Sequence, residues 1–301
     1  MHVIMTSARS HLTDGNTLKL AVQRKGRLTE HSMSLLHHIG LNFESYGQRL
    51  FSRVRNFPLS LLYARDDDIP GYVSLNTVDL GIVGRNLVHE YESDVVEIHA
   101  LGFGYCELVI AVPNESDLRS PEDLRFARIA TSYPSSTRRF FESIGGNPEI
   151  ISISGSVEIA PALDIADAIV DLSATGSSLQ LNDLRPIHSI LESEAILIAN
   201  RDAWEDSARR QNIDRLLMRI NAVEAARQYK YVMMNAHQDA LPAIRAVIPG
   251  LKAPTIVPLA DPGWFAVHTA IDEEDFWDKI EALRAAGASE ILVSSLDKLL
   301  L

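Results

Sequence analysis

The sequence predicts an α/β fold with mostly parallel sheets, organised as two lobes and a small C-terminal module. Three observations lead to this prediction. Apolar runs typical of strands alternate with helical patterns from Leu18 onward. A further apolar run at 195–199 follows the second lobe, so the chain is expected to return to the first lobe there. Residues 226–301 have a β-α-β-β-α-β order of their own, which is the ferredoxin-like order.

The elements of the two lobes are predicted from apolar runs bounded by small residues, and from prolines or capping residues at helix starts. The predicted strands are 18–23, 78–84, 108–112, 128–131, 166–172 and 195–199, and the predicted helices are 29–40, 121–124 and 214–229. This order places residues 1–107, with the return segment 195–225, in the first lobe and residues 108–194 in the second. A cleft between two such lobes is a common ligand site.

The C-terminal module, residues 226–301, is predicted to contain two helices among four strands. The strands are expected at 230–236, 254–259, 265–271 and 290–294, and the helices at 238–248 and 273–286. Asp272 is expected to cap the second helix and Gly287 to end it. A module of this size can sense a metabolite or hold two subunits together, and the sequence leaves both possibilities open.

Composition and charge exclude several classes of protein. A chain of 301 residues with 46% hydrophobic content can bury more than one core. Its net charge of −12 argues against general nucleic-acid binding, which needs an excess of Lys and Arg. Cys106 is the only cysteine, residues 1–16 lack the apolar core of a signal peptide, and no segment reaches the ~18 apolar residues that span a bilayer. We therefore expect a soluble, cytoplasmic protein without nucleic-acid or membrane partners.

The most informative segment is Glu158–Ser178. Its predicted strand ends in a tight turn of small residues, Ala174-Thr175-Gly176-Ser177-Ser178, that leads into a helix. Backbone N–H groups and hydroxyls of such a turn can converge on an anion, and the helix dipole there favours negative charge. Asp171, just before the turn, can accept hydrogen bonds from sugar hydroxyls or help hold a phosphate-bound Mg²⁺. The combination points to a phosphorylated ribose.

Two charged turns are candidates for binding an anionic ligand. Lys25-Gly26-Arg27 follows the first strand, and in open α/β sheets the carboxyl ends of strands face the ligand crevice. We expect Gly26 to permit close approach of a ligand, although a solvated basic turn would have the same sequence. Arg65 begins a second turn, whose acids Asp66 and Asp67 fit a solvated loop better than a metal site.

Motifs of several other enzyme classes are absent from the sequence. There is no GxGxxG, GxxxxGK[ST] or HExxH, no GxSxG in a strand-turn-helix setting, and the histidines do not fall at zinc spacings. Cations, hydroxyls and small loops without an evident nucleophile favour a reaction that depends on alignment and charge stabilisation.

Further segments occur in the same order as the basic turns and the loop at 171–178. They are Val78-Asp79-Leu80-Gly81-Ile82, Arg128-Ile129-Ala130-Thr131-Ser132-Tyr133-Pro134, Gly155-Ser156-Val157-Glu158, Pro254-Thr255-Ile256 and Gly287-Ala288. With these motifs the chain resembles the ATP phosphoribosyltransferase family in its long, self-regulated form, from about Leu18 to Leu296. The resemblance implies two periplasmic-binding-protein-like lobes of type II and a ferredoxin-like regulatory domain.

The same resemblance implies the reaction and the ligands. The substrates would be ATP and phosphoribosyl pyrophosphate (PRPP), with Mg²⁺ carried mainly by substrate phosphates, and the adenine N1 would displace pyrophosphate from carbon 1 of the ribose. L-Histidine would be the feedback inhibitor, AMP a further possible inhibitor, and the protein a homo-oligomer, either a dimer or a hexamer. Two rivals are a two-lobed solute-binding protein and a non-catalytic regulatory subunit. A solute-binding protein would need an export signal, which residues 1–16 do not provide. A non-catalytic regulatory subunit should have lost the phosphate loop, which is intact at 171–178.

The resemblance also assigns roles to individual residues. PRPP would be bound by Glu158, Asp171, Ala174, Thr175, Gly176, Ser177 and Ser178, and the nucleotide by Lys25, Gly26, Arg27, Arg65 and Tyr133. Arg27, Arg65 and Asp171 would be catalytic. Histidine would be held near Asn235, Thr255, Ala288 and Ser289.

The chain departs from the family pattern at several positions. Ala174 stands where Ser or Gly can occur and Ser178 where Thr is usual, and both keep the loop small. Glu107 replaces a common basic residue, Asn76-Thr77 replaces a usual glycine, and Asn235 stands where some relatives have an acid. Because Asn235 cannot pair with the charge of an ammonium group, we expect weaker histidine binding.

Overall fold

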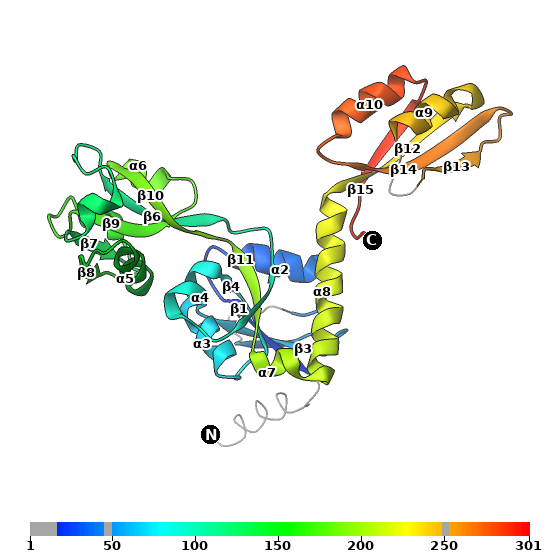
Figure 1. Cartoon of the computed structure of the whole chain (residues 1–301). Coiled ribbons are helices and arrows are strands. Elements are labelled where there is room, and N and C mark those ends of the chain that lie inside the picture. Colours follow the sequence, from blue (N-terminus) through cyan, green and yellow to red (C-terminus); the bar gives the residue numbers. More distant parts are fainter. Residues whose placement is uncertain (1–16, 45–49, 249–252) are drawn as a thin grey trace. The chain divides into compact units, whose positions relative to one another are not determined.

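The computed structural model describes residues 17–44, 50–248 and 253–301, which form two compact units (Figure 1). The first unit contains the chain up to Ser34 together with Leu41–Ile213, and the second contains Leu35–Gly40 together with Asp214–Leu301. The first unit holds two sheets and the second holds one.

The first sheet has six strands in the order β2-β3-β1-β4-β11-β5. The strands are β1 (Leu18–Gln23), β2 (Phe51–Arg53), β3 (Leu59–Ala64), β4 (Leu80–Gly84), β5 (Val96–Ala100) and β11 (Ala195–Ala199). Strand β1 runs parallel to β3 and β4, whereas β11 is antiparallel to β4 and β5. In Figure 1 the yellow-green β11 lies beside the cyan β4, although the whole second sheet separates them in the sequence.

Short helices connect the strands of the first sheet. They are α2 (Thr29–His38), the 3-10 turn η1 (Asp66–Asp68), α3 (Ile69–Ser74), α4 (Arg85–Tyr91) and α7 (Arg201–Glu205), followed by the long α8 (Ser207–Arg227). One core cluster lies where strands β1, β4 and β11 pack with helices α3 and α4, and it includes Ile69, Val73, Leu87 and Ile196.

The second sheet has five strands in the order β10-β6-β9-β7-β8. The strands are β6 (Cys106–Pro113), β7 (Arg128–Thr131), β8 (Glu149–Ser152), β9 (Ala168–Ser173) and β10 (Leu184–Ser193), and the helical elements are η2 (Pro121–Leu124), α5 (Pro134–Ser143), η3 (Val157–Ile159) and α6 (Ser177–Leu181). Strand β7 is parallel to β8 and β9, and β6 is antiparallel to β9 and β10.

Alternate residues of the second sheet enter separate core clusters on its two faces. Along β6, Val109 belongs to one cluster and Leu108 and Ile110 to the other. Because both faces are covered, the interior strands β6, β7 and β9 are largely continuous apolar runs rather than alternating ones. This explains why the sequence showed these three strands, whereas the edge strands β8 and β10 were not predicted.

The second unit contains the C-terminal sheet, in the order β13-β14-β12-β15. Its elements are β12 (Tyr229–His237), η4 (Gln238–Ala240), α9 (Leu241–Val247), β13 (Thr255–Pro258), β14 (Trp264–Asp272), α10 (Phe276–Ala285) and β15 (Ser289–Ser295). All three pairs of neighbouring strands are antiparallel, and the first strand of the module lies between its third and fourth. The predicted ferredoxin-like order of two helices and four strands is therefore confirmed, as is the mixed α/β fold with two sheet-containing lobes. The expectation of mostly parallel sheets is wrong, because among the described strands only the pairs of β1 with β3 and β4 and of β7 with β8 and β9 are parallel.

Several predicted elements begin at other residues than expected. Helix α8 starts at Ser207 rather than 214, because the Asp206 carboxylate accepts a hydrogen bond from Arg209 N at 2.8 Å and so supplies an early cap. Helix α10 starts at Phe276, and Asp272 does not cap it: Asp272 Oδ1 accepts from Glu274 N at 2.9 Å instead. Strand β4 starts at Leu80, since the preceding Asp79 is held by side-chain contacts.

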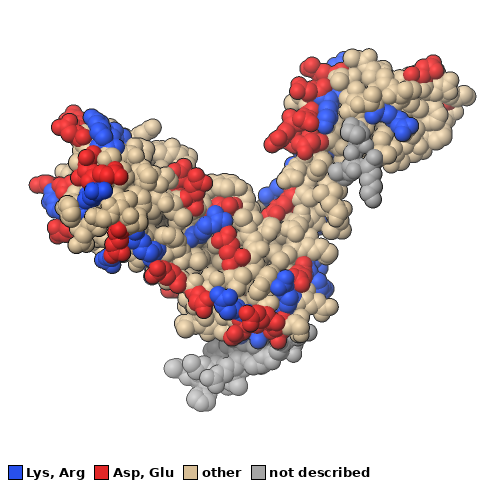
Figure 2. Space-filling view, viewed as in Figure 1, with Lys and Arg blue, Asp and Glu red and all other residues tan. Residues whose placement is uncertain are grey.

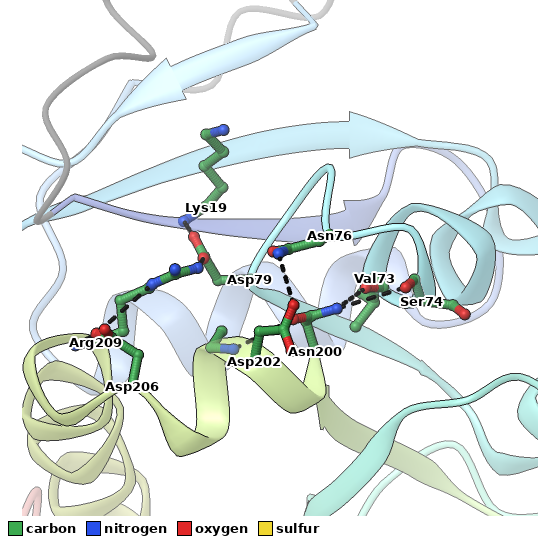
Figure 3. Close-up of polar contacts among 10 residues, drawn as sticks. Lys19, Val73, Ser74, Asn76, Asp79, Asn200, Asp202, Asp206 and Arg209 are labelled. Atoms are coloured by element: carbon green, nitrogen blue, oxygen red, sulfur yellow. Dashed lines mark hydrogen bonds and ion pairs between the residues drawn. The ribbon is translucent and has the colours of Figure 1, made fainter.

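A polar cluster ties the return segment to the first sheet (Figure 3). The buried Asp79 carboxylate accepts from Lys19 N at 2.7 Å and from Arg209 Nη1 at 3.1 Å. Asn200, also buried, donates to Val73 O at 2.9 Å and accepts from Ala203 N at 3.2 Å. The residues just after β11 therefore contact elements at the start of the chain.

The surface carries charges of both signs. On the face shown in Figure 2, the Lys and Arg residues of the described part are scattered among Asp and Glu and form no continuous basic area. Among the described residues, no helix combines the length and the apolar character that crossing a bilayer requires.

Candidate functional site

The residues expected to bind substrate follow the carboxyl ends of parallel strands in both sheets. In the first sheet, the basic turns come directly after β1 and β3, and helix α4 comes after β4. In the second sheet, Tyr133 follows β7, Glu158 follows β8 and the loop 174–176 follows β9. The carboxyl ends of parallel strands meet at one edge of a sheet, and ligands of open α/β folds bind there.

At the edge of the first sheet, the cations of the two turns are exposed to solvent. Lys25, Arg27 and Arg65 are all exposed. Arg27 Nη1 donates to Gly104 O at 2.9 Å, and Gly104 lies in the segment that connects β5 to β6. Arg65 directly precedes η1. Burial and the neighbouring acids raise the pKa of Asp67, and the positive charge of Arg65 opposes part of this rise.

Gly26 is required by the conformation of its own loop. Gly26 has φ +141°, and a Cβ at this position would lie 2.3 Å from Gln23 Nε2. The space beside the glycine is thus filled by a side chain of the protein. Glycine is required here by the way the loop folds over Gln23. The approach of a ligand to Gly26 stays a prediction.

At the edge of the second sheet, two carboxylates lie close enough to influence each other. The pKa of Asp171 is raised to about 6, chiefly by burial and further by the charge of Glu158, while a hydrogen bond from Leu172 N to Asp171 Oδ1 at 2.8 Å opposes the rise. Strand β9 and the turn η3 therefore bring together two residues that the sequence assigned to one ligand.

The loop after β9 presents its hydroxyls to solvent. Thr175, Ser177 and Ser178 are exposed, and Thr175 Oγ1 lies 2.8 Å from Ser177 Oγ. Gly176 has φ +75°, and its N–H donates to Ser173 Oγ at 3.1 Å. The following helix, α6, has only five residues, so hydroxyls and loop N–H groups rather than a long helix dipole would have to hold an anion.

A pocket adjoins this loop. It has a volume of about 430 Å³ and is lined by residues 173–176, residues 186–189, Glu107 and Val109. Glu107 pairs with Glu192 across β6 and β10, and both line a neighbouring pocket with Ser173 and Ala174. The unusual Glu107 thus places a negative charge beside the loop.

Tyr133 contacts both sheets. It packs against the core cluster of the first sheet and against one cluster of the second. Its hydroxyl accepts from Asn86 Nδ2 at 3.4 Å, and Asn86 is a buried residue of α4. Burial raises the pKa of Tyr133, and the negative charge of Asp171 raises it further. Tyr133 is therefore close to the carboxylate pair as well as to the first sheet.

A second contact between the sheets was not predicted. Glu90 of α4 is 5% exposed, and its two carboxylate oxygens accept from Ser135 N and Ser136 N, each at 2.8 Å. These N–H groups belong to the first turn of α5, so a carboxylate from one sheet caps a helix of the other. No sequence motif marks Glu90 because its partners lie far along the chain.

The two arginines of α5 differ in their surroundings. Arg138 is exposed, but Arg139 donates to His89 O and pairs with Glu92 at 3.2 Å. Adjacent charged residues in a short helix are expected on its surface, but Arg139 does not fit this expectation, because it joins the contact between α4 and α5.

In the C-terminal module, three of the four residues expected to bind histidine lie together. Asn235 pairs with Ser289 across β12 and β15, Ser289 Oγ donates to Asn235 O at 3.2 Å, and Ala288 precedes Ser289. Thr255 is separate: it lies on β13, two strands from β12, or ~10 Å at the usual strand spacing. The Asn235 side-chain amide donates to Glu290, so a carboxylate that the sequence did not reveal stands beside Asn235.

The described residues form no complete metal cage. Within these ranges, no group of three or more His, Cys, Asp or Glu side chains converges on a point where a cation could bind. Asp171, whose pKa the charge of Glu158 helps to raise, offers carboxylate oxygens of the kind that Mg²⁺ accepts when a phosphorylated substrate supplies most of its other ligands.

Comparison with known proteins decides the family. The family model for ATP phosphoribosyltransferase matches residues 65–222. The chain is 42% identical over 283 residues to the ATP phosphoribosyltransferase of Bacteroides thetaiotaomicron, covering 94% of this chain and 99% of that protein. The chain belongs to the ATP phosphoribosyltransferase family. The resemblance seen in the sequence motifs is thereby confirmed.

Other comparisons extend this assignment. The model for the C-terminal domain of the same family matches residues 226–298, as expected for an ATP phosphoribosyltransferase of the long form. The relative from Cytophaga hutchinsonii is 41% identical over 282 residues, covering 94% of this chain and 98% of its own. Among solved structures, a chain of the ATP phosphoribosyl transferase complex from Thermotoga maritima superposes with a TM-score of 0.60 and 29% identity, covering 68% of this chain and 97% of its own.

Proposed function

We propose that this protein transfers the phosphoribosyl group of PRPP to N1 of the adenine of ATP, giving N1-(5-phosphoribosyl)-ATP and pyrophosphate, the first step of L-histidine biosynthesis. The observation that carries the proposal is that two sheet edges with different ligand-binding groups are joined by direct contacts. One edge bears exposed cations and the other bears a carboxylate pair with a hydroxyl loop, and Tyr133 and Glu90 connect them. Family membership supplies the reaction.

In this proposal, the edge of the second sheet binds PRPP. Thr175, Ser177 and Ser178, with loop N–H groups and the small residues Ala174 and Gly176, would hold the 5-phosphate. Asp171 would accept hydrogen bonds from the ribose hydroxyls, with Glu158 beside it. The contact between the Thr175 and Ser177 hydroxyls supports this arrangement, because the two groups lie close enough to bind one phosphate.

The edge of the first sheet binds polyphosphate. Lys25, Arg27 and Arg65 would neutralise phosphate oxygens, and Tyr133 would lie against the nucleotide. Arginine suits this role because its planar guanidinium can make two parallel hydrogen bonds to a phosphate.

The reaction needs alignment and charge stabilisation. The lone pair of adenine N1 forms the new bond to carbon 1 of the ribose, and the bond to pyrophosphate breaks with its electrons remaining on the departing oxygen. The transition state has positive charge on the ribose ring and negative charge on the leaving group. At neutral pH, Asp171 is ionised because its pKa is about 6, so its carboxylate can stabilise the ring. Arg27 and Arg65 would hold the triphosphate of ATP in the ground state and stabilise the charge on the departing pyrophosphate only in the transition state. When bound, Mg²⁺ would neutralise phosphate charge; we propose it as the divalent ion.

We further propose that L-histidine inhibits the enzyme through residues 226–301, near Asn235, Ala288 and Ser289. AMP inhibition, a dimeric or hexameric assembly and a cytoplasmic location stay predictions from the family resemblance.

Mixing the purified protein with ATP, PRPP and Mg²⁺ tests the proposed reaction. We expect stoichiometric release of pyrophosphate and the ultraviolet absorbance of phosphoribosyl-ATP, both dependent on each substrate. Pyrophosphate release without ATP, or no product with both substrates, would refute the proposal.

A further inference from the structure

The loop after β1 and the turn after β3 are held against each other by one side chain. Gln23, the last residue of β1, is 5% exposed. Its Nε2 donates to Asp66 Oδ2 at 2.8 Å, and its Oε1 accepts from Leu28 N at 2.9 Å. The side-chain amide of Gln23 therefore donates a hydrogen bond to the turn after β3 and accepts one from the loop after β1.

The backbone of the loop is built around this amide. Gly26 crosses directly over it, since a Cβ there would lie 2.3 Å from Gln23 Nε2 and 2.7 Å from its Cδ. Backbone hydrogen bonds complete the arrangement: Arg24 N donates to Ala64 O at 2.8 Å and Thr29 N to Gly26 O at 3.2 Å. Loop 24–28 and turn 65–68 thus have one common support.

These two segments carry the exposed cations of the first sheet. Lys25 and Arg27 belong to the loop, and Arg65 immediately precedes Asp66. The Gln23 amide is buried beneath them and has both of its hydrogen-bonding ends occupied by protein, so it supports the cations without contacting a ligand itself.

We propose that Gln23 is a positioning residue, which sets the separation between the cations of loop 24–28 and Arg65 so that both engage one polyphosphate group. The inference rests on the proposed function, because that function supplies the polyphosphate substrate. It explains why an amide stands at this position. Leucine would leave Leu28 N and the Asp66 carboxylate without this partner, and glutamate would set a second carboxylate against Asp66.

Binding of inorganic pyrophosphate, measured by calorimetry on the full-length chain with Mg²⁺, tests the proposal together with the KM for ATP. The variants are Gln23→Leu, Gln23→Glu and the double variant Gln23→Glu/Asp66→Asn. The double variant preserves the side-chain shapes and the net charge. It also keeps a hydrogen bond between positions 23 and 66, but the carboxylate is now at position 23 and the amide at position 66. The new amide at position 66 can donate to the new carboxylate at position 23, which still accepts from Leu28 N. Arg138→Ala, an exposed residue of α5, is the control.

We expect each single Gln23 variant to weaken pyrophosphate binding and raise the ATP KM by about tenfold or more, as for lost hydrogen bonds that support a charged site. The double variant should return both values to within roughly threefold of wild type. Normal pyrophosphate binding in folded Gln23→Leu would overturn the proposal. A double variant that regains the wild-type melting midpoint but does not regain pyrophosphate binding would also overturn the proposal. This second comparison tests the positioning role even if Gln23→Leu does not fold.

The same measurements separate this inference from the proposed reaction. A wild-type protein that binds pyrophosphate, but forms no product from ATP and PRPP, contradicts the reaction and leaves the positioning role standing if the variants behave as expected. A wild-type protein that binds no pyrophosphate overturns the positioning role.

Discussion

Asp171 shows most clearly how a site residue can oppose folding stability. Burial and the charge of Glu158 raise its pKa to about 6, above the ~4 of an exposed aspartate. Between these two values the folded protein binds more protons than the unfolded chain, so stability falls as the pH rises through this window. Above pH ~6 the full cost is present, because the ionised carboxylate is then buried beside another acid.

Replacing Asp171 by Asn should therefore raise the stability of the folded protein and weaken its binding of PRPP. Asparagine keeps an oxygen for the bond from Leu172 N, but it carries no charge. At pH 8 we expect Asp171→Asn to be more stable than wild type by about 1–3 kcal/mol, with the difference shrinking as the pH falls from 6 to 4. The PRPP KM should rise at least about tenfold, since hydrogen bonds to a charged acceptor are lost.

Denaturant unfolding at several pH values, with steady-state kinetics at pH 8, measures both effects. Asp117→Asn is the control, because Asp117 is exposed. A difference in stability between Asp171→Asn and wild type that does not change with pH would show that Asp171 has an ordinary pKa.

At the scale of elements, the interior strands of the first two sheets were predicted except β3, and their edge strands β2, β5, β8 and β10 were not. The strands at 18–23, 128–131 and 195–199 were predicted with the observed limits, because they are short apolar runs in the sheet interior. Strand β10 was missed: it lies at a sheet edge, contains Pro186 and has register shifts on both sides of His188 and Ser189. Its pattern of exposure consequently has no simple period.

The candidate site was predictable in part for a related reason. Loops that follow buried strands can be found from sequence; these loops contain Arg27, Tyr133 and Thr175, and Asp171 lies near the end of the strand before one of them. Their supports are Gln23, Asn86 and Glu90, whose partners are distant in sequence, so no local pattern reveals them. The roles of the site residues and the limits of the lobes stay predictions. Asn76 shows how a departure can be harmless, because its φ of +54° is a conformation that Asn and Gly both adopt.

The cap that Glu90 places on α5 should contribute to the stability of the first unit. In Glu90→Gln, one acceptor oxygen is replaced by an NH₂ group that faces an N–H of Ser135 or Ser136. We expect a loss of about 1–3 kcal/mol, seen as a lower thermal midpoint. Glu92→Gln is the matched control, since Glu92 is 70% exposed in its pair with Arg139 and such surface pairs contribute little. Equal effects of the two substitutions would contradict the importance of this cap.

At the scale of the whole molecule, histidine inhibition requires that the C-terminal module and the catalytic unit be coupled. Such coupling is reciprocal in binding free energy, so histidine should lower substrate affinity if it binds residues 226–301. The loss of affinity expected from Asn235 should be offset in part, because Glu290 places a carboxylate beside it that can pair with the ligand's ammonium group.

Glu290→Gln should therefore weaken inhibition by histidine by about tenfold or more while leaving activity without histidine unchanged. Titration of the reaction rate with histidine measures this effect, and Glu274→Gln, an exposed residue just before α10, is the control. Identical inhibition of wild type and Glu290→Gln would remove Glu290 from the histidine site.

The central claim is that the two strand edges divide the substrates between them. The most direct measurement is the KM for each substrate in Thr175→Val, from the edge of the second sheet, and in Arg65→Ala, from the edge of the first. We expect Thr175→Val to raise the PRPP KM by about tenfold or more with little change for ATP, and Arg65→Ala to raise the ATP KM in the same proportion. Arg138→Ala should change neither value. If folded Thr175→Val and Arg65→Ala raise both KM values equally, or leave both unchanged, the assignment of one substrate to each edge is wrong.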